Sequence, residues 1–272
     1  MNNPRLLMTT VALSTLSAVV FSPALLVPSA AIAQAQPTLP TLPIQFNPDT
    51  LENPGRPGDR RRGGGSRGGC QADIPLTAIA YASSQAVEEL GVQSIEETVG
   101  TLTTQAQPVL WFYLPGPLPE GSTAEFIVKG SQNQLLYQGQ LVGETDSSGI
   151  VRVPMPFDLE PDASYHWALI LDCDESDRTW VEGWVERRTA DSLLTDTFAE
   201  TSARNRAALY ASHGYLQDTL TELAALRIAQ PEDDAIAQDW ATFLSDLDLL
   251  DLTAAPLLDC CQVESTMPEG KP

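Results

Sequence analysis

Residues 159–172 read LEPDASYHWALILD, and this stretch decides the class of fold. Leu159, Pro161 and Tyr165 match the L-x-P-x-x-x-Y pattern of a tyrosine corner, where the Tyr hydroxyl bonds back to the backbone of the preceding loop. The residues that follow alternate as in a β-strand with one buried face. The predicted core face of that strand comprises Tyr165, Trp167, Leu169 and Leu171. The stretch therefore predicts a loop that leads into a central strand of a β-sheet.

Further short segments, rich in aromatic and β-branched residues, lie on both sides of this strand and are separated by Gly, Pro, Asp and Ser. They cover residues 74–80, 108–114, 123–129, 134–141, 150–155 and 180–188. With the strand at 164–172 they make seven short strands within residues 70–188. This number of strands and the tyrosine corner predict an antiparallel β-sandwich like those of immunoglobulin and fibronectin type III domains.

Beyond residue 189 the apolar period changes from 2 to 3.6, which predicts a helical domain over residues 189–262. Gly214 is typical of a helix end, and Pro231 of the first turn of a new helix. Residues 208–244 resemble one and a half tetratricopeptide units; a plain helical hairpin that caps the sandwich is the alternative. The predicted fold class is therefore α+β, with the sandwich first and the helices after it.

The two ends of the chain read differently from the middle. Residues 1–33 combine one positive charge, an apolar run and Ala31-Ile32-Ala33, which predicts a secretory signal peptide cleaved after Ala33. The run is broken by Thr, Ser and Pro, so no transmembrane segment is expected. Residues 34–69 are rich in Pro, Gly and Arg and are interpreted as a disordered linker. Residues 263–272 are interpreted as a disordered tail. We therefore expect a periplasmic or secreted protein.

Charge is segregated along the chain, which holds 15 basic and 36 acidic residues. From Cys70 onward there are 9 basic and 33 acidic residues, a net charge of −24. A body this acidic repels nucleic acid and anionic lipid headgroups, so neither is an expected partner. Four arginines of the predicted linker stand apart from this charge: Arg60, Arg61, Arg62 and Arg67. One hypothesis makes them an arm that recognises an acidic partner or folds back on the body. It predicts that their replacement leaves stability nearly unchanged. A passive linker is the alternative.

The cysteines are Cys70, Cys173 and the adjacent pair Cys260 and Cys261. An even number in an exported chain predicts disulfide bonds. A bond between sequence neighbours is strained, so each member of the pair is expected to bond elsewhere or to stay reduced. A bond between Cys70 and Cys173 is slightly favoured over a bond from one of these to the adjacent pair.

A second candidate site is a strand connection with four carboxylates, Asp172, Asp174, Glu175 and Asp177. Such a loop offers the oxygen ligands that calcium prefers, although it lacks the glycine of an EF-hand; a solvated hairpin is the alternative. No other cofactor is expected. The two histidines, His166 and His213, are too few for a catalytic zinc site, and no nucleophile motif is present. We therefore expect no enzyme activity.

Three tryptophans, Trp111, Trp180 and Trp184, are a candidate platform for sugar stacking. Trp180 and Trp184 share one strand face with glutamates. Such a face suits a polysaccharide ligand, but it also suits a strand that a neighbouring helix covers. The second interpretation is preferred, because the predicted helices must pack on the sandwich.

Several short motifs occur in an order and at spacings that resemble one family of exported cyanobacterial proteins, the domain of unknown function numbered 928. They are GGGSRGGC at 63–70, PLTA at 75–78, WFYLP at 111–115, AEF at 124–126, YHW at 165–167, CD at 173–174, DR at 177–178, VEGW at 181–184 and CC at 260–261. The resemblance implies a cyanobacterial source and export, but no activity. The expected function is a non-catalytic interaction module of the periplasm or cell envelope with a protein partner there. A carbohydrate-binding module and, more distantly, an envelope hydrolase are the alternatives.

Overall fold

The computed structural model describes residues 41–51, 58–64, 72–89, 92–116, 122–143, 147–174, 177–190, 201–259 and 261–267. These residues all belong to one unit of the chain, residues 39–272. The predicted signal peptide lies outside the described residues, as do parts of the predicted linker and tail.

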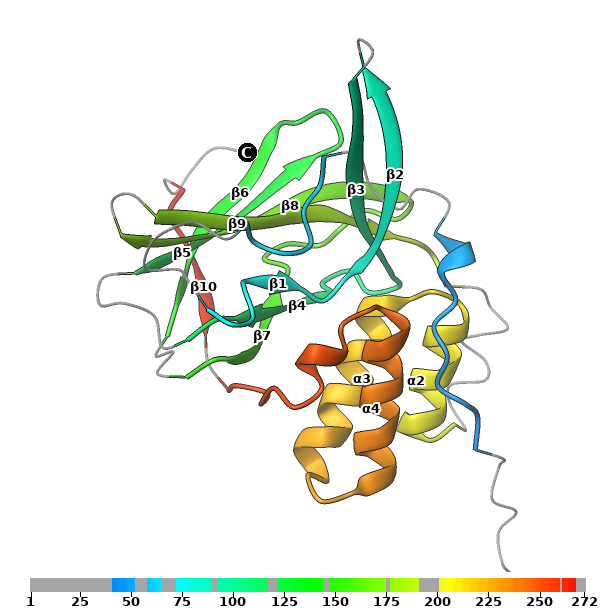
Figure 1. Cartoon of the computed structure of the whole chain (residues 1–272). Coiled ribbons are helices and arrows are strands. Elements are labelled where there is room, and N and C mark those ends of the chain that lie inside the picture. Colours follow the sequence, from blue (N-terminus) through cyan, green and yellow to red (C-terminus); the bar gives the residue numbers. More distant parts are fainter. Residues whose placement is uncertain are drawn as a thin grey trace, which may run out of the picture. The chain divides into compact units, whose positions relative to one another are not determined.

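Two sheets account for the strands of the described residues (Figure 1). The larger sheet has seven strands in the order β10-β6-β5-β8-β9-β3-β2, and the smaller has three in the order β1-β4-β7. Neighbours are antiparallel except β3 and β9, which are parallel. The strands are β1 Thr77–Ala78, β2 Tyr81–Glu89, β3 Val92–Thr103, β4 Val109–Leu114, β5 Thr123–Gly130, β6 Leu135–Val142, β7 Gly149–Pro154, β8 Ala163–Asp174, β9 Asp177–Arg187 and β10 Gln262–Ser265.

The first core lies between the two sheets. Phe112 of β4 contacts Trp167 of β8 edge-to-face, with ring centroids 5.4 Å apart. The predicted core face of β8 is confirmed, because all four of its residues are buried in this cluster. The tyrosine-corner contact is present as well: the Tyr165 hydroxyl accepts a hydrogen bond of 2.9 Å from the Glu160 N–H.

Three helices follow the strands: α2 Ala203–Ser212, α3 Leu216–Ala229 and α4 Asp234–Asp246. The described chain forms three helices, one more than the plain hairpin that was one of the two alternatives. Gly214, with φ of +76°, ends the first of these helical segments as predicted, because glycine adopts this left-handed conformation without strain. The His213 Nδ1 lies 2.8 Å from the Leu209 carbonyl oxygen, at the carboxyl end of α2. Asp233, rather than Pro231, caps the start of α4.

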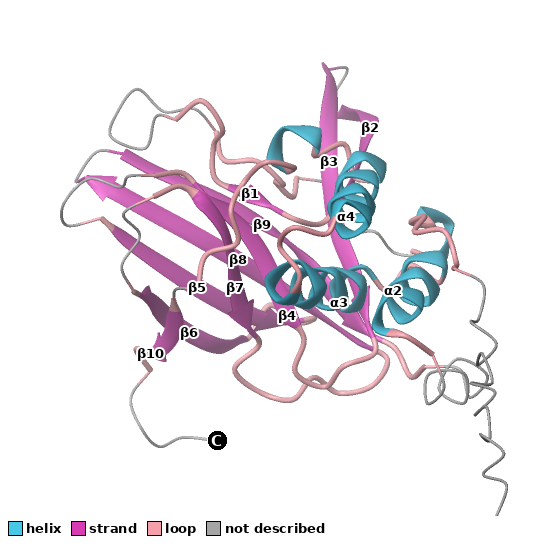
Figure 2. Ribbon diagram, turned by 90° about the horizontal axis from the view of Figure 1, so that it is seen from below, coloured by secondary structure: helices cyan, strands magenta, loops and turns pink. Residues whose placement is uncertain are grey.

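A second core lies between the helices and the smaller sheet (Figure 2). Side chains alternate along β4, so Trp111 and Tyr113 face the helices while Leu110 and Phe112 face the first core. The smaller sheet is therefore a middle layer, covered by the larger sheet on one face and by the helices on the other. The described chain has the α+β organisation that was predicted, with its helices after the sheets.

The interpretation of residues 34–69 as a disordered linker is wrong for the parts that are described. Ile44, Phe46 and Leu51 are buried in the second core, and the Phe46 ring contacts the Phe243 ring with centroids 5.9 Å apart. A short 3-10 helix, η1 Pro48–Thr50, lies between them. The composition of residues 34–69 predicted disorder because it averages over the whole segment. A few apolar side chains are enough to hold such a segment in place when they are buried against the helices.

Three strands were not predicted, and each is a polar strand at or near a sheet edge. β2 and β3 form a long hairpin (Figure 1) whose residues 83–86 and 93–97 are Ser, Gln, Ala and Glu apart from the exposed Ile95. β10 begins at the end of the predicted helical domain and continues into the predicted tail, pairing with β6. Such strands are held mainly by backbone hydrogen bonds and need little apolar burial. Their sequences therefore lack the apolar alternation on which strand prediction depends.

Candidate functional site

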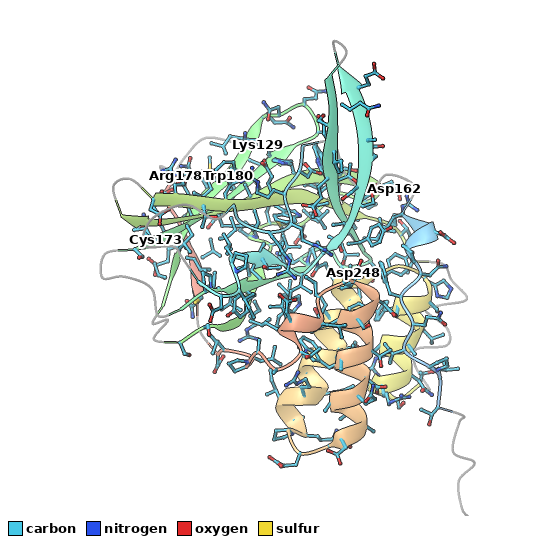
Figure 3. All side chains as sticks on the ribbon, viewed as in Figure 1. Lys129, Asp162, Cys173, Arg178, Trp180 and Asp248 are labelled. Atoms are coloured by element: carbon cyan, nitrogen blue, oxygen red, sulfur yellow. The ribbon has the colours of Figure 1, made fainter. Side chains whose placement is uncertain are left out.

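The outer face of the seven-stranded sheet, meaning the side of β5, β8 and β9 turned away from the first core, holds the candidate site. Pairing register sets its residues in rows. His166 lies between Lys129 and Trp184 in one row. In the next row Ala168 lies between Ile127 and Glu182, and in the third Ile170 lies between Glu125 and Trp180. Figure 3 shows Lys129, Arg178 and Trp180 on this side of the sheet, away from the helices.

Two hollows adjoin on this outer face and share His166 and Glu182. The first has a volume of about 260 Å³, and the second of about 330 Å³. The first is lined by Gly58, Asp59, Gly130, Asn133, His166, Glu182 and Trp184. The second is lined by Ile127, Lys129, His166, Ala168, Ile170, Arg178, Trp180 and Glu182. Each hollow therefore joins a tryptophan to charged side chains.

Two carboxylates face the imidazole of His166. Its Nε2 lies 3.4 Å from Glu182 Oε2 and 4.0 Å from Asp59 Oδ1. Glu182 Oε1 accepts a hydrogen bond of 2.9 Å from Trp180 Nε1, and Asp59 Oδ2 accepts one of 3.1 Å from the Val99 N–H. The hydrogen bond with His166 is the main cause that lowers the pKa of Glu182, although partial burial opposes it. Glu182 is therefore a fixed, ionised acceptor at the boundary of the two hollows.

The three predicted platform tryptophans do not come together. Trp111 is 5% exposed and lies on the helix side of the middle layer. Trp184 is 9% exposed, with its ring 5.1 Å from that of His166, and the guanidinium of Arg60 lies 4.3 Å from the centre of the Trp180 ring. The expectation that helices cover this Trp and Glu face is also wrong, because the helices pack on the smaller sheet.

Residues 58–64, which we call the strap, cover part of the face instead. The strap lies between β3 and β9, where these strands diverge: Gly58 donates a backbone hydrogen bond to Glu97 of β3, and Arg60 exchanges two with Glu182 of β9. The strap then reaches the smaller sheet, where Gly63 donates to Leu76 and Arg61 accepts from Ala78. An inserted peptide satisfies backbone groups that the diverging strands leave exposed.

The strap also holds three of the four arginines predicted as a recognition arm. Arg61 donates through its side chain to the Leu247 carbonyl oxygen, and Arg62 forms a two-pronged ion pair with Asp251, with N–O distances of 2.7 Å. Arg60 stacks on Trp180. These three side chains therefore contact the chain's own body, as the fold-back alternative expects, and recognition of a partner by the arm stays a prediction. Arg67 lies outside the described residues.

The predicted calcium loop is divided between the two faces of the sheet. Asp172 is on the outer face, where Arg178 donates to both of its carboxylate oxygens. Asp177 is 2% exposed and belongs to the alternate, inward-facing set of β9. Glu175 and the side chain of Asp174 lie outside the described residues. No cluster of three or more His, Cys, Asp or Glu suited to a metal occurs among the residues that are described.

Two of the four cysteines are described, Cys173 in β8 and Cys261 immediately before β10. Both take part in disulfide bonds, and neither is free. Cys70 and Cys260 lie outside the described residues, so the pairing among the four cysteines stays a prediction.

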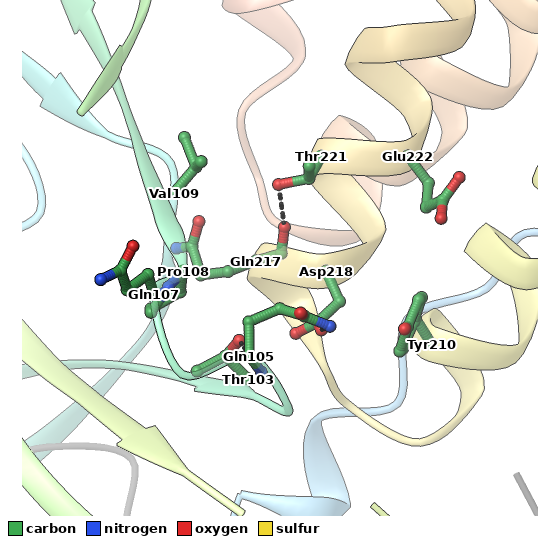
Figure 4. A pocket seen from close by; sticks show the side chains of 10 residues that line it. All are labelled: Thr103, Gln105, Gln107, Pro108, Val109, Tyr210, Gln217, Asp218, Thr221 and Glu222. Carbon is green, nitrogen blue, oxygen red and sulfur yellow. Dashed lines mark hydrogen bonds between the residues drawn. The ribbon is translucent and has the colours of Figure 1, made fainter. Parts of the chain in front are cut away.

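A further hollow, of about 300 Å³, lies between α3 and the β3–β4 connection (Figure 4). At its edge Asp218, only 4% exposed, accepts hydrogen bonds from the N–H and hydroxyl of Thr104 and from the Gln105 amide. Burial raises the pKa of Asp218, and the bonds from Thr104 and its neighbours oppose this rise. The carboxylate thus ties the helices to the larger sheet. Sequence reasoning missed it, because its partners lie more than 110 residues away.

The described helices include none that is both long and apolar enough to span a membrane.

Comparison with known proteins identifies one family that matches this chain. The family model described as Domain of Unknown Function (DUF928) matches residues 62–257, more than half of the chain. No curated protein and no solved structure matches the chain significantly.

Proposed function

The chain belongs to the DUF928 family, and from this premise we propose that it is an exported, non-catalytic binding module of the periplasm or cell envelope. Its binding site is the outer face of the seven-stranded sheet around His166. The observation that carries this proposal is the pair of adjoining hollows that share His166 and Glu182. Export rests on the sequence of residues 1–33.

Binding is favoured over catalysis because the polar groups hold one another in place. Glu182 is held by Trp180 and His166, and Asp59 by the Val99 backbone. The described lining of the two hollows contains no Ser, Thr or Cys that His166 could activate as a nucleophile. A fixed set of acceptors beside an aromatic wall is suited to holding a ligand.

A carbohydrate ligand is the second candidate, and one observation favours it over a protein partner. Trp180 and Trp184 line different hollows of the same face, each beside a hydrogen-bonding side chain. Sugars need this combination, because a pyranose ring has an apolar C–H face and a rim of hydroxyl groups.

The experiment fills the hollows and measures binding to envelope material. Ala168 is the smallest side chain among the three rows, so Ala168→Trp should block the second hollow while the strand is kept. The purified mature chain is sedimented with envelope fragments from its source cells, and we expect A168W to abolish co-sedimentation. Ala237→Trp, at an exposed position of α4, is the matched control and should bind like the natural chain. Equal binding of both variants would exclude this face as the site.

Export has its own test. Native protein isolated from the envelope fraction should begin at Gln34, as determined by N-terminal sequencing. A native chain that begins at Met1 would contradict the signal-peptide interpretation.

We also propose that the two sheets are related to immunoglobulin-like sandwiches and the helices to tetratricopeptide units. The hydrogen bond between Tyr165 and Glu160 supports the first relation. The left-handed Gly214 between α2 and α3 supports the second. The parallel pairing of β3 with β9 is a departure from the sandwich pattern.

A further inference from the structure

The shape of the second hollow follows from one small residue. Ala168 stands in the centre of the outer face, between Ile127 of β5 and Glu182 of β9. Its methyl group is shorter than every side chain around it, so the surface is depressed there. Ile127 and Ile170 complete an apolar floor, and Trp180 stands at the side. The volume of about 330 Å³ is at the small end of ligand sites, where a single ring fits.

The charges around this hollow differ on its two sides. Lys129 of β5 lines one side and forms no ion pair with any other described residue. Glu182 of β9 lines the other side and is ionised. Arg178, at one end of the hollow, forms an ion pair with Asp172. Of the two basic side chains Lys129 and Arg178 that line this hollow, Lys129 is therefore the one that is ready to bind an anion.

We infer that the second hollow binds a single acidic sugar residue. The strands β5 and β9 are separated by one strand, and Lys129 and Glu182 lie in neighbouring rows, so their backbones are roughly 12 Å apart and their side chains narrow this gap. One pyranose ring with its substituents spans that gap. Its carboxylate would meet Lys129, its hydroxyl groups would donate to Glu182, and its C–H face would lie on Ala168 and Ile127. This inference rests on the proposed function, because it names the ligand of the same face.

The charge of the whole chain limits the ligand to few acidic groups. A net charge of −21 repels a polyanion beyond the reach of one lysine. A single carboxylate placed directly beside Lys129 gains most of the local attraction and meets little of the long-range repulsion. We therefore expect selectivity for one acidic residue over a continuous acidic polysaccharide.

The test compares acidic sugars with their neutral parents. Glucuronate and galacturonate are titrated into the mature chain and followed by amide NMR, with glucose and galactose as the neutral probes. We expect the acids to bind more tightly and to shift amides of β5, β8 and β9. Lys129→Met should weaken the acids by roughly fivefold and leave the neutral sugars unchanged. Arg152→Met, which removes an exposed cation from β7, is the matched control and should change neither.

The outcomes separate the two proposals. Equal affinity for acidic and neutral sugars, or no effect of K129M, would overturn the acidic-sugar inference. If A168W still abolished binding to envelope fragments, the proposed function would stand without it. No sugar binding together with A168W-sensitive envelope binding would overturn the inference in favour of a protein partner. If A168W also left envelope binding intact, both proposals would fail.

Discussion

Replacing Arg61 by alanine tests whether the strap holds the layers of this protein together. The Arg61 backbone contacts both sheets, because its N–H donates to the Glu97 carboxylate and its carbonyl oxygen accepts from the Ala78 N–H. Its guanidinium donates to the Leu247 carbonyl oxygen at the carboxyl end of α4. One residue therefore connects all three layers, and Arg61→Ala removes only the connection to the helices.

The expected loss is about 2 kcal/mol of unfolding free energy. A hydrogen bond from a charged donor contributes roughly 1.5–3 kcal/mol. A cation at a helix carboxyl end adds about 0.3–1 kcal/mol. Removing the guanidinium also removes the cost of burying its charge, which offsets part of this loss. That cost is evident because burial is the main cause that lowers the Arg61 pKa. Arg61→Lys keeps the charge and should lose less than Arg61→Ala.

Urea unfolding followed by tryptophan fluorescence measures the effect, because Trp180 and Trp184 report on the sheet and Trp240 on α4. Arg152→Ala, which removes an exposed arginine on β7, should change stability by less than about 0.5 kcal/mol. If R61A is as stable as R152A, the Arg61 side chain does not tie the helices to the sheets. A role of Arg61 in recognising a partner would then be favoured.

Three further changes test other parts of the structure. Tyr165→Phe should lower the unfolding free energy by about 1 kcal/mol, because it removes a single hydrogen bond from the loop backbone; an unchanged urea midpoint would argue against the corner. Asp218→Ala should lower it by about 2 kcal/mol, because the Thr104 N–H loses its acceptor in a part-buried site; wild-type stability would show that this contact is dispensable. Glu182→Gln tests the lowered carboxyl pKa. A lowered folded pKa adds stability that is present above the unfolded value, about 4.3, and is lost as the pH falls through the folded pKa. The stability difference between E182Q and the natural chain should therefore shrink on acidification in that range, and a difference independent of pH would contradict the assignment.

Local pattern was enough to predict seven of the ten strands that the structure describes. In β8, period-two alternation identified the core face from Tyr165 to Leu171, and it placed His166 on the outer face. The change to a period of 3.6 located the helical region, and Gly214 its first break. These features were accessible because each is determined by neighbouring residues and by the burial of one face.

Polar edge strands and long-range ties were not accessible in this way. The hairpin of β2 and β3 has few apolar residues, and the strap was taken for a linker because arginine and glycine dominate it. Which charges meet also depends on tertiary structure. Arg62 pairs with Asp251, which is 189 residues away in the sequence, and Asp218 accepts a hydrogen bond from Thr104, which is 114 residues away.

The candidate site shows the same division. Its residue types could be listed from β8 and β9 alone, including His166 and the two tryptophans beside glutamates. Only the assembled layers decide that Trp111 turns to the helices, that Arg60 stacks on Trp180, and that Lys129 of another strand lines the hollow over Ala168. The physical reason is that alternation assigns a side chain to one of two faces, whereas the packing of distant segments decides which of those faces stays open to a ligand.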